Sequence, residues 1–186
     1  MAHDAALTQL AELALDCGFS HSGRLAIQTL VIRSQVRDAC AADKCRAYGK
    51  NWSCPPACGT LEECERRIRQ YRAGLVLQTT GRLEDSFDYE AMTELAARHN
   101  GCLAAFQEKL QPVTGASFPP PFLLLGSGGC RICESCTCPE SPCRFPGRMI
   151  ISMEAMGLQV SEVCAANGLP YYYGPATLTY VGCVLI

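Results

Sequence analysis

The chain has 186 residues, of which 48% are hydrophobic and 18% are charged, and its formal net charge is −2. It lacks a polybasic run and any stretch of about 18 uninterrupted apolar residues, so neither nucleic acid nor a membrane is expected as a partner. No basic segment followed by an apolar one opens the chain, which argues against a signal peptide. We therefore expect a cytoplasmic protein with a single α/β domain over residues 1–186.

Patterns typical of helices and strands alternate from the start of the chain. Asp4 is a suitable N-cap for a first helix that Gly18 would end. The aliphatic run at residues 25–32 predicts a strand. Thr60 and Glu63 then form a Thr-x-x-Glu capping box, which predicts a helix running to about residue 71.

The same alternation continues to the end of the chain. The run QPVTGASFPPP at residues 111–121 should break a long helix and lead into a buried strand. The remaining patterns predict strands at 74–80, 122–125 and 176–186 and helices at 88–110 and 152–167, the last interrupted at Gly157. The expected fold is α/β, with a small sheet of about four strands, flanking helices and two cysteine-rich loops at strand ends.

Fourteen cysteines in a cytosolic chain need an explanation other than disulfides, because the cytosol keeps thiols reduced. Most of them fall in two stretches, which we name the first cysteine segment (residues 40–64) and the second cysteine segment (residues 130–143). The others lie among apolar neighbours and are expected to pack as small hydrophobic residues: Cys17, Cys102, Cys164 and Cys183. The clustering predicts that the two segments bind metal.

The second cysteine segment contains the run C-x-x-C-x-x-C, formed by Cys130, Cys133 and Cys136. This spacing lets neighbouring thiolates reach different iron atoms of one cubane cluster, as in bacterial ferredoxins. The fourth ligand is Cys143 or Cys138, and we favour Cys143 because Cys138 would crowd the corner that Cys136 occupies. Zinc is the main alternative, although zinc ribbons usually present two separate C-x-x-C pairs.

Two glycines stand directly before this run. Without side chains, Gly128 and Gly129 would let backbone N–H groups approach a cofactor and offset its negative charge. We therefore predict that both glycines contribute to cofactor binding.

The first cysteine segment is less diagnostic. Cys54 precedes two prolines, which fix the chain beside a ligand, and Cys64 lies near a helix N-terminus, where the helix dipole stabilises a thiolate. The spacing from Cys40 to Cys45 is compatible with one cluster but does not by itself indicate one.

The stretches CRAYGKNWSCPP, GTLEEC, GGCRICESCTC, CRFP and SMEAMGLQV together resemble a family of predicted metal-binding proteins, the domain of unknown function numbered 2284. Members of this family occur largely in anaerobic bacteria and archaea. The resemblance spans nearly the whole chain and implies metal binding through cysteine, without a particular activity. The ligand positions that it implies are Cys40, Cys45, Cys54, Cys64, Cys130, Cys133, Cys136 and Cys143. Cys58 stands where similar chains often have another residue, so it is treated as a spare thiol.

Two sets of four cysteines suggest two [4Fe–4S] clusters, with a larger fused cluster or zinc as alternatives. The leading hypothesis is an iron–sulfur protein that passes electrons to a redox partner enzyme of anaerobic metabolism. The alternatives are a reductase or other enzyme with an open iron site, and a zinc-binding or metal-handling module. A homo-oligomer is compatible with all three.

Basic side chains and one histidine each have two interpretations. Basic residues around the cysteines either offset cluster charge or form a docking rim for an acidic redox partner: Lys44, Arg46, Lys50, Arg131, Arg144 and Arg148. His99 lies on the apolar face of the long helix, where a hydrogen-bonded core histidine is a better interpretation than a metal ligand.

Overall fold

The computed structural model describes residues 2–114 and 122–186. Along the chain these residues form α1 (Ala2–Asp16), β1 (His21–Leu25), the 3-10 helix η1 (Ile27–Thr29), α2 (Ser34–Ala41), α3 (Leu61–Ile68), β2 (Gly74–Arg82), α4 (Tyr89–Thr114), β3 (Leu123–Gly126), β4 (Ile151–Ser152), α5 (Val160–Ala166) and β5 (Thr177–Leu185). The α/β class is therefore confirmed, with five strands in the described residues where about four were expected.

The strands form one mixed sheet in the order β1-β2-β5-β3-β4. β5 lies at its centre and pairs antiparallel with β2 along its full length, from Gly74 opposite Leu185 to Arg82 opposite Thr177. β3 pairs antiparallel with the end of β5, and the short β4 pairs parallel with β3. The second cysteine segment begins four residues after Gly126, the last residue of β3, so β3 anchors the start of that segment.

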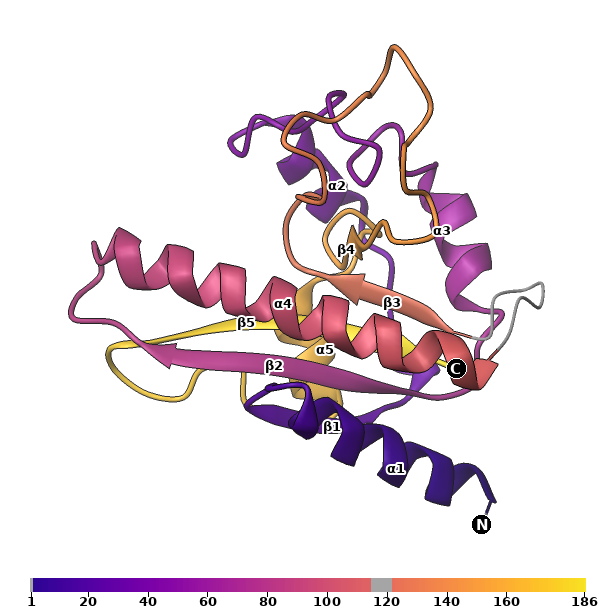
Figure 1. Cartoon of the computed structure of the whole chain (residues 1–186), viewed down its shortest axis with the longest axis vertical. Helices are drawn as coiled ribbons and strands as arrows, with labels where there is room; N and C mark the ends of the chain where they lie inside the picture. The colour runs from indigo at the N-terminus through magenta and orange to yellow at the C-terminus, as the bar shows by residue number, and fades with distance from the viewer. Residues whose placement is uncertain (1, 115–121) are drawn as a thin grey trace.

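Side chains of the central strands alternate between two hydrophobic layers, as the two-residue period of a strand requires. On one face, strand residues pack with α1 and α4; on the other, they pack with η1, α3 and α5. In β2, for example, Leu75 and Leu77 belong to the first layer and Val76 to the second. Figure 1 shows α4 running across the sheet, with both cysteine segments gathered above β3 and β4.

Most of the predicted elements are present. The strands expected at 74–80, 122–125 and 176–186 correspond to β2, β3 and β5, and the helix expected at 88–110 is α4. The capping box is confirmed: the Thr60 hydroxyl accepts a hydrogen bond from the Glu63 N–H, and the Glu63 carboxylate accepts one from the Thr60 N–H at 2.7 Å. Cys64 faces the core from α3, as expected.

The strand predicted at 25–32 is wrong. The pairing strand lies earlier, at β1, and the aliphatic run that follows forms η1, whose Ile27 and Leu30 side chains enter the core. A short apolar run satisfies burial equally well as a turn when other groups meet its backbone. Here Asn167 accepts a hydrogen bond from the Ala26 N–H at 2.9 Å.

The helix predicted at 152–167 is also wrong in its first half. Residues 151–152 form β4, a turn follows, and the helix begins only at Val160. Gly157 has a φ of +82°, a conformation that a helix excludes, which explains the break. Two smaller corrections concern helix ends: α1 begins at Ala2, before the expected N-cap Asp4, and α4 continues through residues 111–114. The rest of the expected break, residues 115–121, lies outside the described residues.

None of the helices in residues 2–114 and 122–186 combines the length and apolar character needed to cross a membrane.

Candidate metal centre

Four thiols of the second cysteine segment surround one small hollow. Cys130, Cys133, Cys136 and Cys143 all line it, together with the apolar side chains of Ile132, Phe145 and Met149. Burial raises the pKa of Cys130, and the nearby thiols of Cys143, Cys133 and Cys136 raise it further. The turn-rich segment thus brings its widely spaced cysteines to one place.

Gly128 and Gly129 shape the entry to this segment. Gly128 has a φ of +72°, which favours glycine, and it lies at the surface. A β-carbon on Gly129 would lie 3.4 Å from the Cys54 Sγ atom. This is an ordinary van der Waals distance, so the Cys54 thiol of the first segment lies beside the backbone of the second.

Asn51 and Ser53 join the two cysteine segments through hydrogen bonds. The Asn51 amide donates to the Cys130 carbonyl at 2.9 Å, and the Cys130 N–H donates to the Ser53 hydroxyl at 2.8 Å. The same hydroxyl donates to the Asn51 side-chain oxygen at 3.0 Å, so the three residues form a closed network. Ser53 is completely buried. These contacts fix the position of Cys130 from the first segment.

Two further contacts join the segments. The Trp52 indole N–H donates to the Ser141 carbonyl at 3.0 Å, and Trp52 also lines the thiol hollow. The Cys138 thiol donates to the Gly49 carbonyl at 3.8 Å, so Cys138 faces the first segment and not the hollow. Sequence reasoning left Cys138 and Cys143 open as the fourth thiol, and Cys143 is the one that lines the hollow.

Cys40, Cys45 and Cys54 of the first segment lie near one another. Burial raises the pKa of Cys54, and the thiols of Cys45, Cys40 and Cys136 raise it further. Cys40 lies in the last turn of α2. Burial raises its pKa, and the Glu154 carboxylate and the Cys45 thiol raise it further. Because Cys136 is among the thiols that raise the pKa of Cys54, these two residues lie near each other where the segments adjoin.

Cys64 and Cys58 pack towards the core, although the Cys58 N–H donates a hydrogen bond to the Cys54 carbonyl at 3.0 Å. The Cys64 side chain is 2% exposed and belongs to the hydrophobic core, where its sulfur accepts a hydrogen bond from the Arg37 guanidinium at 3.3 Å. Burial raises the pKa of Cys58 to about 11, although Arg37 opposes the shift, and its thiol donates to the Ala155 carbonyl at 3.7 Å. Cys58 packs against the core. Cys64 as a metal ligand and Cys58 as a spare thiol both stay predictions.

The donor set suits a thiophilic metal, since soft thiolates select iron–sulfur clusters, zinc or copper(I) over hard cations. Within residues 2–114 and 122–186, however, no three His, Cys, Asp or Glu side chains are gathered tightly enough to hold a single metal ion. The four thiols of the second segment therefore share a hollow without meeting at one point.

Sequence reasoning missed Asn51 and Ser53 as residues of the site. Their signal was the N-x-S pattern in KNWSCPP, in which the Asn51 side chain accepts from the Ser53 N–H at 3.1 Å and forms a local turn. This pattern predicts the turn but not its partner, because Cys130 lies 77 residues away from Ser53.

The residues expected to be structural or peripheral lie where their chemistry places them. Cys102, Cys164 and Cys183 are buried, Cys17 is partly buried, and His99 is 1% exposed. The basic side chains of the expected docking rim are all exposed: Lys44, Arg46, Lys50, Arg131, Arg144 and Arg148.

Comparison with known proteins gives one match. A family model described as "Predicted metal-binding protein (DUF2284)" matches residues 23–186. No curated protein and no solved structure matches the chain.

Proposed function

Because the chain belongs to the DUF2284 family of predicted metal-binding proteins, we propose that it is an iron–sulfur protein that carries electrons to a partner redox enzyme. Two [4Fe–4S] clusters, one associated with each cysteine segment, are the proposed cofactors. The observation that carries the proposal is the hollow shared by Cys130, Cys133, Cys136 and Cys143. In a cubane cluster each iron takes a separate thiolate, so spaced thiols around a hollow are the expected donor arrangement.

The chain would contribute more than ligands. Trp52, Phe145 and Met149 border the hollow and would limit the access of water, which influences the reduction potential of a bound cluster. The Asn51 and Ser53 network would keep the backbone of Cys130 in place. When bound, a [4Fe–4S] cluster supplies one-electron redox chemistry.

Electron transfer is proposed because charged groups suited to a partner surround the cysteine segments. The exposed guanidinium groups of Arg131, Arg144 and Arg148 lie on or beside the second segment. A positive rim steers an acidic partner toward the site and orients it on contact. The partner class that this surface fits is an acidic redox protein.

The decisive measurement is iron and sulfide quantitation on protein purified without oxygen, combined with electron paramagnetic resonance of the dithionite-reduced protein. Two [4Fe–4S] clusters correspond to about eight iron and eight sulfide per chain. Protein that contains zinc but neither iron nor sulfide would refute the iron–sulfur proposal and support the zinc alternative.

The variant Cys133→Ala tests the second segment directly. Removing one thiolate should lower the iron and sulfide content to about half, because the cluster of the first segment keeps its own ligands. Cys17→Ala is the matched control, since it removes a thiol that lies in neither segment. If Cys133→Ala kept as much iron as Cys17→Ala and the wild type, Cys133 would not be a ligand.

A further inference from the structure

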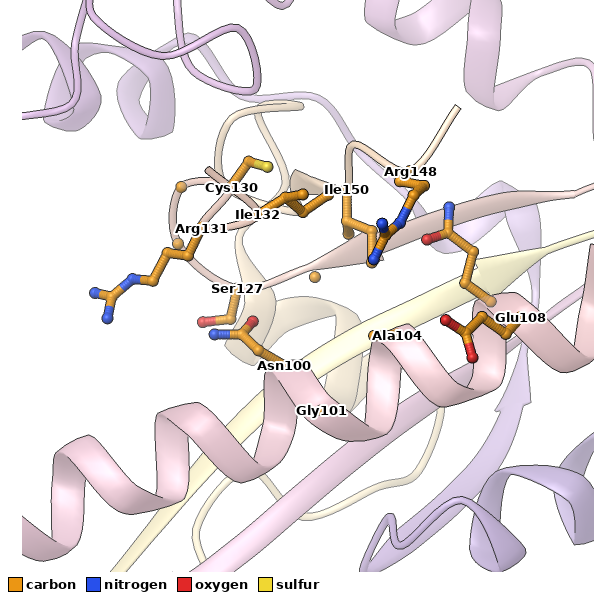
Figure 2. Close-up of a pocket in the computed structure, with 14 residues that line it drawn as sticks. Asn100, Gly101, Ala104, Glu108, Ser127, Cys130, Arg131, Ile132, Arg148 and Ile150 are labelled. Atoms are coloured by element: carbon orange, nitrogen blue, oxygen red, sulfur yellow. The ribbon is translucent and has the colours of Figure 1, made fainter. Parts of the chain in front are cut away.

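A cavity of about 510 Å³ lies between α4 and the chain that leads from β3 into the second cysteine segment. Figure 2 shows Asn100, Gly101, Ala104 and Glu108 along the helix on one side and Ser127 to Ile132 on the other. Cys130 is part of its wall, so the cavity shares a residue with the thiol hollow. Its volume lies within the range of small-molecule sites in proteins.

The cavity is open because one face of α4 carries small residues. Gly101 and Ala104 are exposed, and a β-carbon added to Gly101 would meet nothing within 4 Å. The opposite face of α4 buries Leu103 and Phe106 against the sheet. A glycine inside a helix costs about 1 kcal/mol relative to alanine, and here it leaves this face of α4 without a side chain that could fill the cavity.

Gly126 closes the base of the cavity. A β-carbon there would lie 2.8 Å from the Leu103 side chain and 3.1 Å from the Ile150 side chain. The glycine thus allows β3, α4 and the residues before β4 to pack closely beneath the cavity. The base is apolar, and the polar groups lie around the opening.

A guanidinium group of the cavity is placed to bind an anion. Figure 2 shows the Arg148 side chain turned towards the other lining residues and the Arg131 side chain extending outward, so Arg148 supplies the positive charge inside the cavity. Glu108 contributes a negative charge and Asn100 an amide. The Arg148 guanidinium carbon lies 5.8 Å from the centre of the Phe145 ring, a cation–π contact. The Gln107 amide donates to the Gly147 carbonyl at 3.3 Å and so attaches the segment that carries Arg148 to α4.

We propose that this cavity binds a small organic carboxylate. A guanidinium matches a carboxylate through two parallel hydrogen bonds, and the apolar base accommodates a carbon skeleton. The Glu108 carboxylate balances the charge of Arg148, which disfavours a polyphosphate because such a ligand needs several positive groups. The proposal does not depend on the identity of the metal, although a ligand in this cavity would lie against the chain at Cys130.

The test is isothermal titration of the metal-loaded protein under anaerobic conditions with acetate, succinate, glutamate, citrate and benzoate. Inorganic phosphate and ATP form the comparison arm. At least one carboxylate should bind with a dissociation constant below about 1 mM and more tightly than either phosphate compound. Failure of all five carboxylates, or tighter binding of phosphate or ATP, would overturn the proposal.

Two variants locate the binding. Gly101→Phe places a ring in the cavity without a clash at the β-carbon and should abolish binding, whereas Gly101→Ala should leave it unchanged. Arg148→Gln should weaken binding by about tenfold or more, whereas Arg82→Gln, at the end of β2 and outside the cavity, should not. Unchanged affinity in both Gly101→Phe and Arg148→Gln would place the ligand elsewhere.

Metal content, measured on the same samples, separates this proposal from the previous one. If Gly101→Phe keeps the metal content of the wild type and loses the carboxylate, the cavity is a ligand site separate from the metal ligands. If the wild-type protein contains no iron but still binds the carboxylate, the iron–sulfur proposal fails and the cavity proposal stands.

Discussion

Cysteine has two physical roles in this chain, and the surroundings of each thiol distinguish them. Cys183 on β5 is completely buried in the core, and burial strongly raises its pKa, so it acts as a small apolar side chain. The thiols of Cys133, Cys136 and Cys143 are only partly buried and border the hollow. Partial exposure is what a thiol needs to exchange its proton for a metal.

His99 is a buried titratable residue, through which the stability of the core depends on pH. It is 1% exposed on α4, and its Nδ1 atom lies 2.9 Å from the Thr79 hydroxyl. Among the residues that the structure describes, none forms a hydrogen bond with the Nε2 atom, and the ring packs edge-on against Phe19. The expectation of a core histidine is confirmed, with a hydrogen bond at Nδ1.

At the scale of single residues, His99 predicts how the stability of the protein changes in acid. Burial lowers the pKa of His99 to about 4 from its usual 6.5, so below pH 6.5 the unfolded chain binds a proton that the folded chain excludes. This contribution to stability is complete above about pH 6.5, falls as the pH drops toward 4, and amounts to about 3 kcal/mol. Urea unfolding of the wild type and His99→Phe between pH 7 and 4.5 measures it.

The variant His99→Phe keeps an aromatic ring in the core but cannot titrate, so its free energy of unfolding should depend less on pH than that of the wild type. His21→Gln is the control, because it leaves His99 in place and should keep the wild-type dependence. The same pH dependence in the wild type and in His99→Phe would contradict the assignment to His99.

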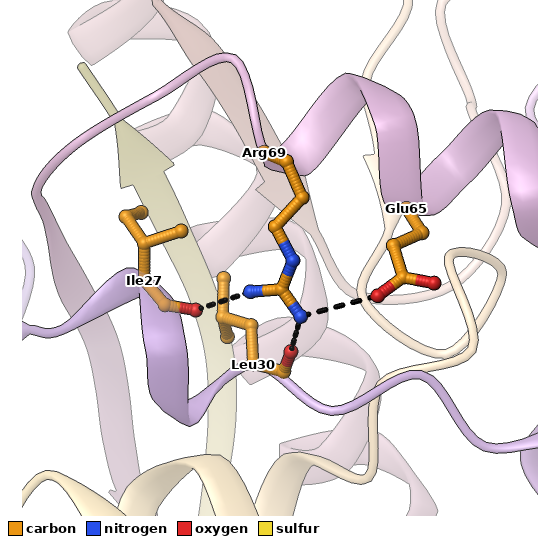
Figure 3. A network of polar contacts seen from close by, with 4 residues as sticks. All are labelled: Ile27, Leu30, Glu65 and Arg69. Carbon is orange, nitrogen blue, oxygen red and sulfur yellow. Dashed lines mark hydrogen bonds and ion pairs between the residues drawn. The ribbon is translucent and has the colours of Figure 1, made fainter.

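At the scale of helices and strands, side chains from distant parts of the sequence stabilise short helices. Figure 3 shows the Arg69 guanidinium at the end of α3 donating to the carbonyls of Ile27 and Leu30 at 3.0 and 3.1 Å. It also forms an ion pair with Glu65 at 3.2 Å. These bonds satisfy backbone carbonyls of η1, the region in which a strand was predicted. A single side chain from a distant helix thus helps to stabilise a turn that local sequence does not specify.

The parts of the fold that could be predicted are those whose signals are local. The Thr60–Glu63 box and the apolar period of α4 lie within one helix, so the sequence near them contains the whole cause. β1 was missed because its sequence, HSGRL, carries little apolar alternation and its strand character depends on pairing with β2.

In the candidate site, too, the features with a local sequence signal could be predicted and those that depend on tertiary packing could not. The C-x-x-C-x-x-C run predicted that Cys130, Cys133 and Cys136 act together, and they line one hollow. The contact between the segments and the cavity beside α4 could not be predicted, because both depend on tertiary packing between residues far apart in the chain.

A substitution at Ser53 tests the hydrogen bonds that join the two cysteine segments. Ser53→Ala removes a hydroxyl that donates to Asn51 and accepts from the Cys130 N–H. An unpaired buried N–H costs about 1–3 kcal/mol, so the thermal stability should fall and the second segment should lose part of its metal. Metal content and circular dichroism melting measure the two effects.

Thr29→Ala is a matched control for Ser53→Ala. The Thr29 hydroxyl also makes two hydrogen bonds, donating to the Ala26 carbonyl at 2.6 Å and accepting from the Asn167 amide at 2.8 Å, and it lies in neither cysteine segment. We expect Thr29→Ala to lower stability by a similar amount and to keep the full metal content. Equal loss of metal in both variants would attribute the effect to general destabilisation.

At the scale of the whole molecule, regular structure and cysteine chemistry are separated. The sheet and its helices form two hydrophobic layers, whereas both cysteine segments lie together above β3 and β4 (Figure 1). Residues 42–60 and 127–150 consist of turns and irregular chain. The sheet therefore has a core that does not include most of the predicted ligands, and the segments depend on each other and on whatever they bind.

This separation predicts which residues metal binding protects from amide hydrogen exchange. Reconstitution with iron and sulfide without oxygen should slow amide hydrogen exchange in residues 40–64 and 130–143 by about tenfold or more, because ligand bonds would restrain segments made mostly of turns and irregular chain. Exchange in β2 and β5 should stay unchanged, since their ladder is complete from Gly74 to Arg82 without the metal. Hydrogen-exchange mass spectrometry of both forms measures this, and Cys133→Ala should lose the protection of the second segment. Protection that spreads equally into β2 and β5 would instead mean that metal binding and folding of the whole chain form one cooperative step.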